Sequence, residues 1–88
     1  MKRRMRHRRS LENERMGHRV WVEEIPDHPL LLPLGFCRGR EVTPIMRQPL
    51  GGPLIVEVAG RRVAISREIA RRIRVSEVGG AAFHAAAE

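Results

Sequence analysis

Aromatic residues are scarce in this sequence, which has Trp21, Phe36 and Phe83 and no tyrosine. A folded core must therefore be built from Val, Ile and Leu. Cys37 is the only cysteine, so the chain cannot form an intramolecular disulfide, which suits a reducing cytosol. No apolar run approaches the roughly 20 residues of a membrane-spanning helix, and no apolar segment of a secretory signal follows the basic N-terminus. We therefore expect a cytoplasmic protein that does not insert directly into a membrane.

The sequence also lacks the groupings that catalysis and metal binding require. Catalysis needs converging groups with tuned pKa values, and the central part of the chain has no Ser/His/Asp set, no paired carboxylates on one strand face and no lysine. The candidate metal ligands are scattered, and no pair has ligand spacing. These ligands are His7, His18, His28, Cys37 and His84. We expect no enzyme activity, no cofactor and no tight metal site.

The excess positive charge lies at the N-terminus. Residues 1–19 hold eight basic and two acidic residues, whereas residues 20–88 hold nine arginines and eight acidic residues. Residues 1–16 have few apolar side chains and are expected to form a basic, disordered, solvated arm. Two other interpretations stay open: an electrostatic contact with nucleic acid or an anionic membrane face, or a start-site artefact with translation beginning at Met16. The candidate electrostatic residues are Lys2, Arg3, Arg4, Arg6, Arg8 and Arg9.

Alternating apolar and polar residues predict five short strands in the middle of the chain. The expected strands cover residues 19–25, 41–47, 54–59, 62–65 and 74–76. In the second strand, Val42 and Met46 are expected on one face, and Pro44 implies an edge position or a bulge. Gly60 is expected as the first central residue of a type II′ turn that leads into the fourth strand.

Two apolar segments complete the predicted domain. Ser66 is the expected N-cap of a short helix over residues 67–72. Leu30–Leu32, which precede Pro33, predict a short irregular plug over one end of a barrel, or an exposed docking patch. The element order predicts a mainly β fold: a small SH3-like barrel of about five short strands, with one short helix before the last strand and flexible termini. The barrel is expected over residues 17–77 and an Ala/Gly-rich tail over residues 78–88.

Residues 48–53 form the most marked loop of the sequence, because they are apolar, Gly-rich and bracketed by prolines. A Gly-Gly pair can cradle phosphate where it opens a helix, but a strand follows here, so this interpretation is weak. We expect a wide hairpin connection in which Leu50 is either folded back onto the core or offered to a partner. The candidate partner-binding residues are Met46, Pro49, Leu50, Gly51, Gly52, Pro53 and Leu54.

Residues 17–77 resemble the FeoA domain. The resemblance is carried by Leu34-Gly35-Phe36 with Gly39 and Val42, by the segment from Pro49 to Leu54, by Gly60, and by the ending Ile65-Ser66, Glu68, Ala70, Ile73 and Val75. Two features depart from the family pattern. Gly52 stands where many members have Asp, and residues 30–33 replace the more usual Arg-containing helical turn.

The resemblance implies an SH3-like barrel and a bacterial accessory role in ferrous iron transport. As a non-enzymatic module, the chain would dock through its barrel loops on the cytosolic part of a membrane ferrous-iron permease that contains a GTPase. Two alternatives stay open: a detached C-terminal domain of a metal-dependent repressor, and a nucleic-acid-binding SH3-like protein. Nucleic acid would be bound only through residues 1–15.

Overall fold

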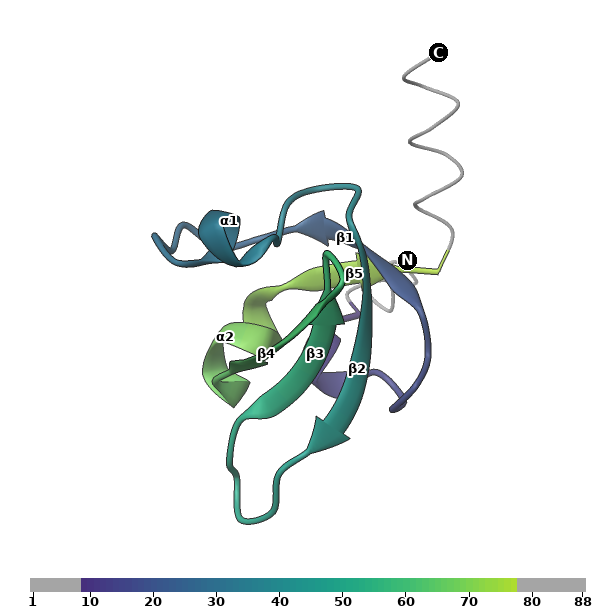
Figure 1. The fold of residues 1–88 in the computed structure, drawn as a ribbon, viewed down its shortest axis with the longest axis vertical. Helices are drawn as coiled ribbons and strands as arrows, with labels where there is room; N and C mark the ends of the chain where they lie inside the picture. Colours follow the sequence, from purple (N-terminus) through teal and green to yellow (C-terminus); the bar gives the residue numbers. More distant parts are fainter. Residues whose placement is uncertain (1–8, 78–88) are drawn as a thin grey trace, which may run out of the picture.

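The computed structural model describes residues 9–77, which form one antiparallel sheet and three short helical segments (Figure 1). The strands are β1 (Val20–Glu24), β2 (Glu41–Arg47), β3 (Leu54–Val58), β4 (Arg61–Ile65) and β5 (Arg74–Ser76). The helical segments are η2 (Leu11–Asn13), α1 (Leu31–Leu34) and α2 (Arg67–Arg72). The predictions for residues 1–8 and 78–88 lie outside the described residues.

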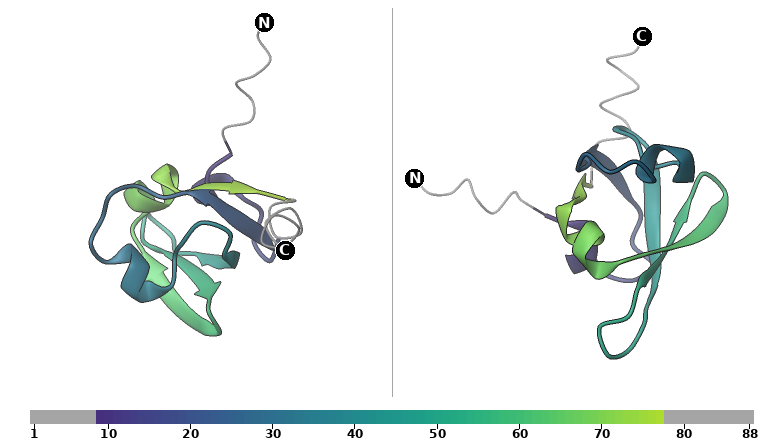
Figure 2. Two further views of the ribbon diagram at one scale, coloured as in Figure 1. Left: turned by 90° about the horizontal axis from the view of Figure 1, so that it is seen from above. Right: turned by 90° about the vertical axis from the view of Figure 1, so that its left-hand side faces the viewer.

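The sheet has the strand order β4-β3-β2-β1-β5 and curls around an aliphatic core (Figure 2). Because buried residues of β1 and β3 alternate with partly buried or exposed ones, each strand contributes one buried face. Among the described residues, Phe36 is the only aromatic side chain in this core. The core consists of Leu11, Val20, Val22, Leu31, Phe36, Val42, Leu54, Val56, Val58, Ile65, Ala70, Ile73 and Val75. The prediction of a mainly β fold with a short helix before the last strand is confirmed.

Strand β2 contains the predicted bulge at Pro44. Pro44 lies opposite Val56 and Met46 lies opposite Ile55, so Ile45 is the extra residue of β2. Because a bulge changes the face on which the following residues lie, Met46 points outward and is 51% exposed. The prediction that Met46 shares the buried face of Val42 is therefore wrong.

The turn between β3 and β4 differs from the prediction by one residue. Val58 pairs with Arg61, so Ala59 and Gly60 are the two central residues, with φ of +54° and +78°. Positive φ at both positions is typical of a type I′ turn, not of the expected type II′ turn.

The three consecutive leucines have different environments. Leu31 is buried in the core, whereas Leu30 and Leu32 are 60% and 65% exposed. Helix α1 ends at Gly35, whose φ of +108° is left-handed. A Cβ atom on Gly35 would lie 3.2 Å from the Cβ of Ala59, so the end of α1 packs closely on the β3–β4 turn.

Helix α2 forms as predicted. The Ser66 hydroxyl accepts a hydrogen bond from the backbone N–H of Ile69 at 3.2 Å. The buried face of α2 contributes Ala70 to the core.

The N-terminal strap, residues 9–14, extends the sheet beyond β5 and corrects the predicted domain boundary. The N–H of Leu11 donates to the carbonyl of Ile73 at 2.9 Å, and the N–H of Val75 donates to the carbonyl of Arg9 at 3.1 Å. Leu11 is fully buried. The prediction that residues 9–16 belong to a disordered arm is therefore wrong. The sequence did not reveal the strap for two reasons. Leu11 is its one buried apolar side chain, and a single residue gives no periodic pattern. The strap is otherwise held by backbone hydrogen bonds, which do not depend on residue type.

Candidate interaction site

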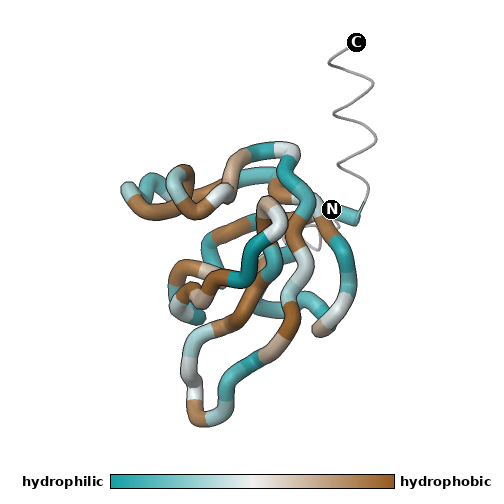
Figure 3. Tube along the Cα trace, viewed as in Figure 1, coloured by the Kyte–Doolittle hydropathy of each residue, from teal (hydrophilic) through white to brown (hydrophobic). Residues whose placement is uncertain are grey.

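The loop between β2 and β3 projects from the barrel and carries an apolar tip (Figure 3). At the tip, the N–H of Gly52 donates to the carbonyl of Pro49 at 3.1 Å, which closes a tight turn. The two central residues, Leu50 and Gly51, have φ of +58° and +74°. Positive φ at both positions is again typical of a type I′ turn, in which Asn, Asp and Gly are preferred.

Leu50 is unusual in both its exposure and its backbone. Its relative exposure is 102%, so its side chain contacts almost nothing. The left-handed conformation costs an L-residue other than glycine roughly 1–2 kcal/mol. Of the two expected outcomes for Leu50, folding back onto the core is therefore wrong, and the side chain is offered to solvent.

The other candidate partner-binding residues divide into a surface set and a core residue. Met46, Pro49, Gly51 and Pro53 are exposed, and Gly52 is half-buried. Leu54 is fully buried, so its inclusion among the partner-binding residues is wrong. It is the first residue of β3, whose inward face starts there. The surface set, Met46 with residues 49–53, is named the loop surface.

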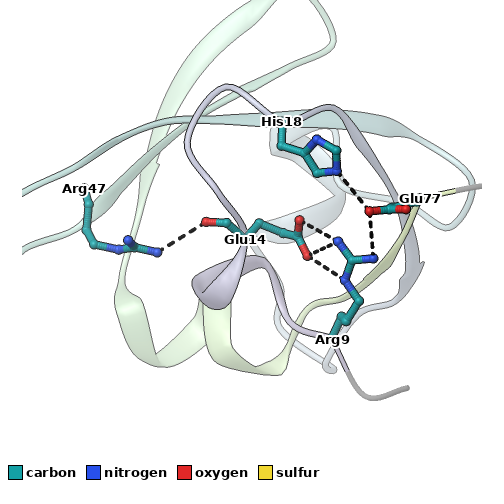
Figure 4. Close-up of polar contacts among 5 residues, drawn as sticks. All are labelled: Arg9, Glu14, His18, Arg47 and Glu77. Carbon is teal, nitrogen blue, oxygen red and sulfur yellow. Dashed lines mark hydrogen bonds and ion pairs between the residues drawn. The ribbon is translucent and has the colours of Figure 1, made fainter. Parts of the chain in front are cut away.

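The strap is fastened to the base of this loop. The Nη2 of Arg47, the last residue of β2, donates to the main-chain carbonyl of Glu14 (Figure 4). It also donates to the main-chain carbonyl of Glu12. Among the described residues, the guanidinium of Arg47 makes no ion pair, so no carboxylate neutralises its charge. The sequence did not predict this contact between Arg47 and Glu14. Every residue has a main-chain carbonyl, so no residue type marks the one that accepts the hydrogen bond.

A polar cluster joins the strap to the end of β5 (Figure 4). Arg9 contacts Glu14 at 2.7 Å and Glu77 at 3.2 Å. Glu77 also lies 3.2 Å from the Nε2 of His18. The hydrogen bonds from His18 and Arg9, together with the charge of Arg9, lower the pKa of the Glu77 carboxyl below its ordinary value. Arg9, expected in the electrostatic arm, is thus part of the folded domain. Lys2, Arg3, Arg4, Arg6 and Arg8 lie outside the described residues.

An open pocket lies beside this cluster. Its lining residues are Gly17, His18, Arg19, Trp21 and Glu77. Its only carboxylate is already in contact with the Arg9 guanidinium, which would repel a cation. Over residues 9–77, no three or more His, Cys, Asp or Glu side chains come together in a group that could hold a metal ion.

The remaining candidate ligands have local roles or lie outside the described residues. The Nδ1 of His28 accepts a hydrogen bond from the N–H of Leu30 at 3.2 Å, at the start of α1. Cys37 is a half-buried free thiol. His7 and His84 lie outside the described residues. None of the helices described in the structure is long and apolar enough to span a membrane.

Comparison with known proteins identifies the family. The model of the FeoA domain matches residues 10–77. The solution structure of a FeoA protein from Chlorobium tepidum is 27% identical, with a TM-score of 0.71 over 78% of this chain and 70% of that one. The crystal structure of Stenotrophomonas maltophilia FeoA with zinc is 31% identical, with a TM-score of 0.66 over 76% of this chain and 88% of that one.

A more distant match extends the comparison to regulators. A manganese-dependent transcriptional repressor is 21% identical, with a TM-score of 0.68 over 80% of this chain and 41% of that one, which shows a shared fold alone. No curated protein sequence matches the chain.

The Stenotrophomonas protein is described as a procaryotic SH3 domain protein. The predicted SH3-like fold is thus confirmed. Since the family model covers most of the sequence, this chain belongs to the FeoA domain family.

Proposed function

We propose that the protein is a non-enzymatic, cytoplasmic accessory protein of ferrous iron uptake. It binds a cytosolic part of the GTPase-containing iron permease through the loop surface. Membership of the FeoA family supports the connection with iron transport. The Stenotrophomonas relative is described as a candidate activating factor of bacterial ferrous iron transport. The observation that carries the docking mode is the exposed, left-handed Leu50.

Leu50 has two features that are energetically unfavourable in the isolated domain. The first is backbone strain at φ +58°. The second is an exposed apolar side chain, whose burial in a partner would gain about 1.5–3 kcal/mol. An Asn or Gly at this position would avoid both costs, because each tolerates the left-handed conformation and neither is large and apolar. A partner pocket that buries Leu50 gives this residue a physical role.

The loop is also preorganised for binding. The turn at its tip is closed by a hydrogen bond, and a second bond joins the N–H of Gln48 to the carbonyl of Pro53 at 3.3 Å. Pro49 and Pro53 fix their own φ angles. A rigid loop loses little conformational entropy on association. Met46, at the base of the loop, adds a second exposed apolar side chain.

The test is capture of the purified cytosolic part of the permease by the full chain. Leu50→Asp is expected to abolish capture while circular dichroism stays unchanged, because an exposed tip can be charged without disturbing the core. Leu32→Asp is the matched control: it introduces the same charge at an exposed leucine in α1, and capture is expected to be retained. The proposal would be wrong if the Leu50→Asp protein captured the permease fragment as well as the unmodified chain does.

A further inference from the structure

Three parts of the fold meet at the end of the barrel that carries the loop surface. Arg47 pairs with Leu54, and Leu54 pairs with Ile65, so the end of β2, the start of β3 and the end of β4 lie side by side. Helix α2 begins two residues after Ile65 and packs against η2 of the strap. The strap also contacts the end of β2, because the carbonyl of Glu14 accepts a hydrogen bond from Arg47. The loop end is defined as residues 9–15, residues 47–53 and α2.

The loop end carries the whole net charge of the described domain. With histidine neutral, residues 9–77 hold twelve arginines and nine acidic residues. The loop end holds six of these arginines and three glutamates. These nine residues are Arg9, Glu12, Glu14, Arg15, Arg47, Arg67, Glu68, Arg71 and Arg72. The rest of the domain holds six arginines and six acidic residues, so its positive and negative charges balance.

Three arginines of the loop end have no carboxylate partner. Each glutamate of the loop end already pairs with a different arginine. These pairs are Glu14–Arg9 at 2.7 Å, Glu12–Arg71 at 3.2 Å and Glu68–Arg72 at 3.6 Å. No ion pair within residues 9–77 includes Arg15, Arg47 or Arg67. Arg15 and Arg47 are exposed, and the half-buried Arg67 has two N–H groups, Nε and Nη1, without an acceptor in the described part of the chain.

We propose that the partner site for the loop surface is an apolar pocket bordered by carboxylates. This inference rests on the proposed function and adds the chemistry of the partner. Leu50 would enter the pocket, while the arginines without a carboxylate partner would face its acidic border. Opposite charges around a buried apolar contact speed the encounter of two proteins and fix their relative orientation. Because charges at the rim of an interface stay hydrated, they affect the rate of association more than the rate of dissociation.

Two other anionic partners suit the loop end less well. The phosphates of a nucleic acid would attract the arginines, but Leu50 would stay in water, and the loop end has no aromatic side chain for base stacking. An anionic lipid surface would accept Leu50, but it has no fixed shape. The turn over residues 49–52 is closed by a hydrogen bond and holds Leu50 in one backbone conformation. A preformed turn favours a partner with a pocket of complementary shape.

The test measures how fast the full chain binds the purified cytosolic part of the permease. Association and dissociation rates are recorded by surface plasmon resonance at about 50 mM and about 500 mM salt. Arg15→Glu is expected to slow association on the order of fivefold at the lower salt concentration, because it changes the charge near the acidic border by two units. At the higher concentration the effect is expected to disappear through screening, and dissociation is expected to change less than about twofold. Arg67→Gln, which removes one charge, is expected to slow association about twofold.

Arg61→Glu is the matched control for Arg15→Glu. Arg61 is also exposed and makes no ion pair within residues 9–77, but it is the first residue of β4, whose last residue lies at the loop end. Its reversal is expected to leave the association rate within about twofold of that of the unmodified chain. If Leu50→Asn weakens capture while Arg15→Glu and salt leave the association rate unchanged, the proposed function stands and the acidic border is wrong. Unchanged capture by Leu50→Asp would overturn both.

Three further results would overturn the inference. Equal slowing by Arg61→Glu and Arg15→Glu would show that the effect belongs to the total charge of the chain. Salt dependence that is lost only on charge reversal at Lys2, Arg3 and Arg4 would assign the attraction to the N-terminal residues. A DNA duplex, or vesicles containing phosphatidylglycerol, could also displace the permease fragment. If Arg15→Glu weakened that displacement, the loop end would be assigned to phosphates instead.

Discussion

Glu14 accepts two hydrogen bonds from the guanidinium of Arg9, each 2.8 Å long, and its side chain is only 4% exposed. Its main-chain carbonyl accepts a further bond from Arg47 (Figure 4). One glutamate thus fastens the strap through both its side chain and its backbone. Because a buried carboxylate needs a partner, the stability of the domain depends on residues that precede the first strand.

The ion pair between Arg9 and Glu14 is expected to stabilise the fold measurably. Arg9→Ala would leave the buried carboxylate without its cation and should lower the free energy of unfolding by about 2 kcal/mol in urea. Arg19→Ala is the control, because the Arg19–Glu41 pair has side chains 66% and 45% exposed and should contribute less than about 0.5 kcal/mol. Equal losses from the two substitutions would show that the burial of Glu14 has no energetic consequence.

The strap should be indispensable, whereas the residues before it should not be. Leu11→Ala removes a fully buried side chain and is expected to cost about 3 kcal/mol of unfolding free energy. That is a large share of the stability of so small a domain. Deletion of residues 2–8 is expected to leave the urea midpoint unchanged. The corrected domain boundary would be contradicted if Leu11→Ala unfolded at the same midpoint as the unmodified chain.

Most of the barrel could be predicted because its signals are local. The alternation of Leu54, Val56 and Val58 predicts a strand with one buried face, and β3 forms there. Ser66 offers an oxygen to the first turn of a helix, and α2 begins at the next residue. Each of these elements depends on residues within a few positions of one another. The sequence alone therefore contains what is needed to find them.

The predictions that were wrong concern features that depend on how the backbones of neighbouring strands pair. The pairing of Val58 with Arg61 moves the β3–β4 turn by one residue, and no side-chain pattern distinguishes the two registers. The bulge was expected from Pro44, but its consequence for Met46 depends on which residue is extra. The candidate site shows the same limit. The apolar loop was visible in the sequence, whereas the left-handed φ of Leu50 follows only from the closed turn.

Acid should remove the contribution of Glu77 to stability. Its pKa is lowered by the hydrogen bonds from His18 and Arg9, so the folded state favours the ionised carboxylate. That contribution is fully present above the ordinary glutamate value of about 4.3 and is lost as the pH falls through the lower folded pKa. Urea midpoints of the unmodified chain and Glu77→Gln should differ at pH 5.5, and the difference should shrink as the pH is lowered below about 4.3. In a His18→Ala background the difference at pH 5.5 should also shrink. A difference that stays constant as the pH falls would contradict this account.

Replacing Leu50 should separate folding from binding. Leu50→Asn keeps the left-handed turn with a residue that tolerates it and is expected to raise the free energy of unfolding by about 0.5–1 kcal/mol. The same substitution should weaken capture of the permease fragment, because the apolar side chain is lost. Leu32→Asn is the control: Leu32 is exposed in a right-handed helical turn, so no backbone strain is relieved and no gain is expected. Urea unfolding measures the first effect and titration calorimetry the second. A Leu50→Asn protein that is less stable than the unmodified chain would show that Leu50 supports the fold, and its place in the loop surface would then need another explanation.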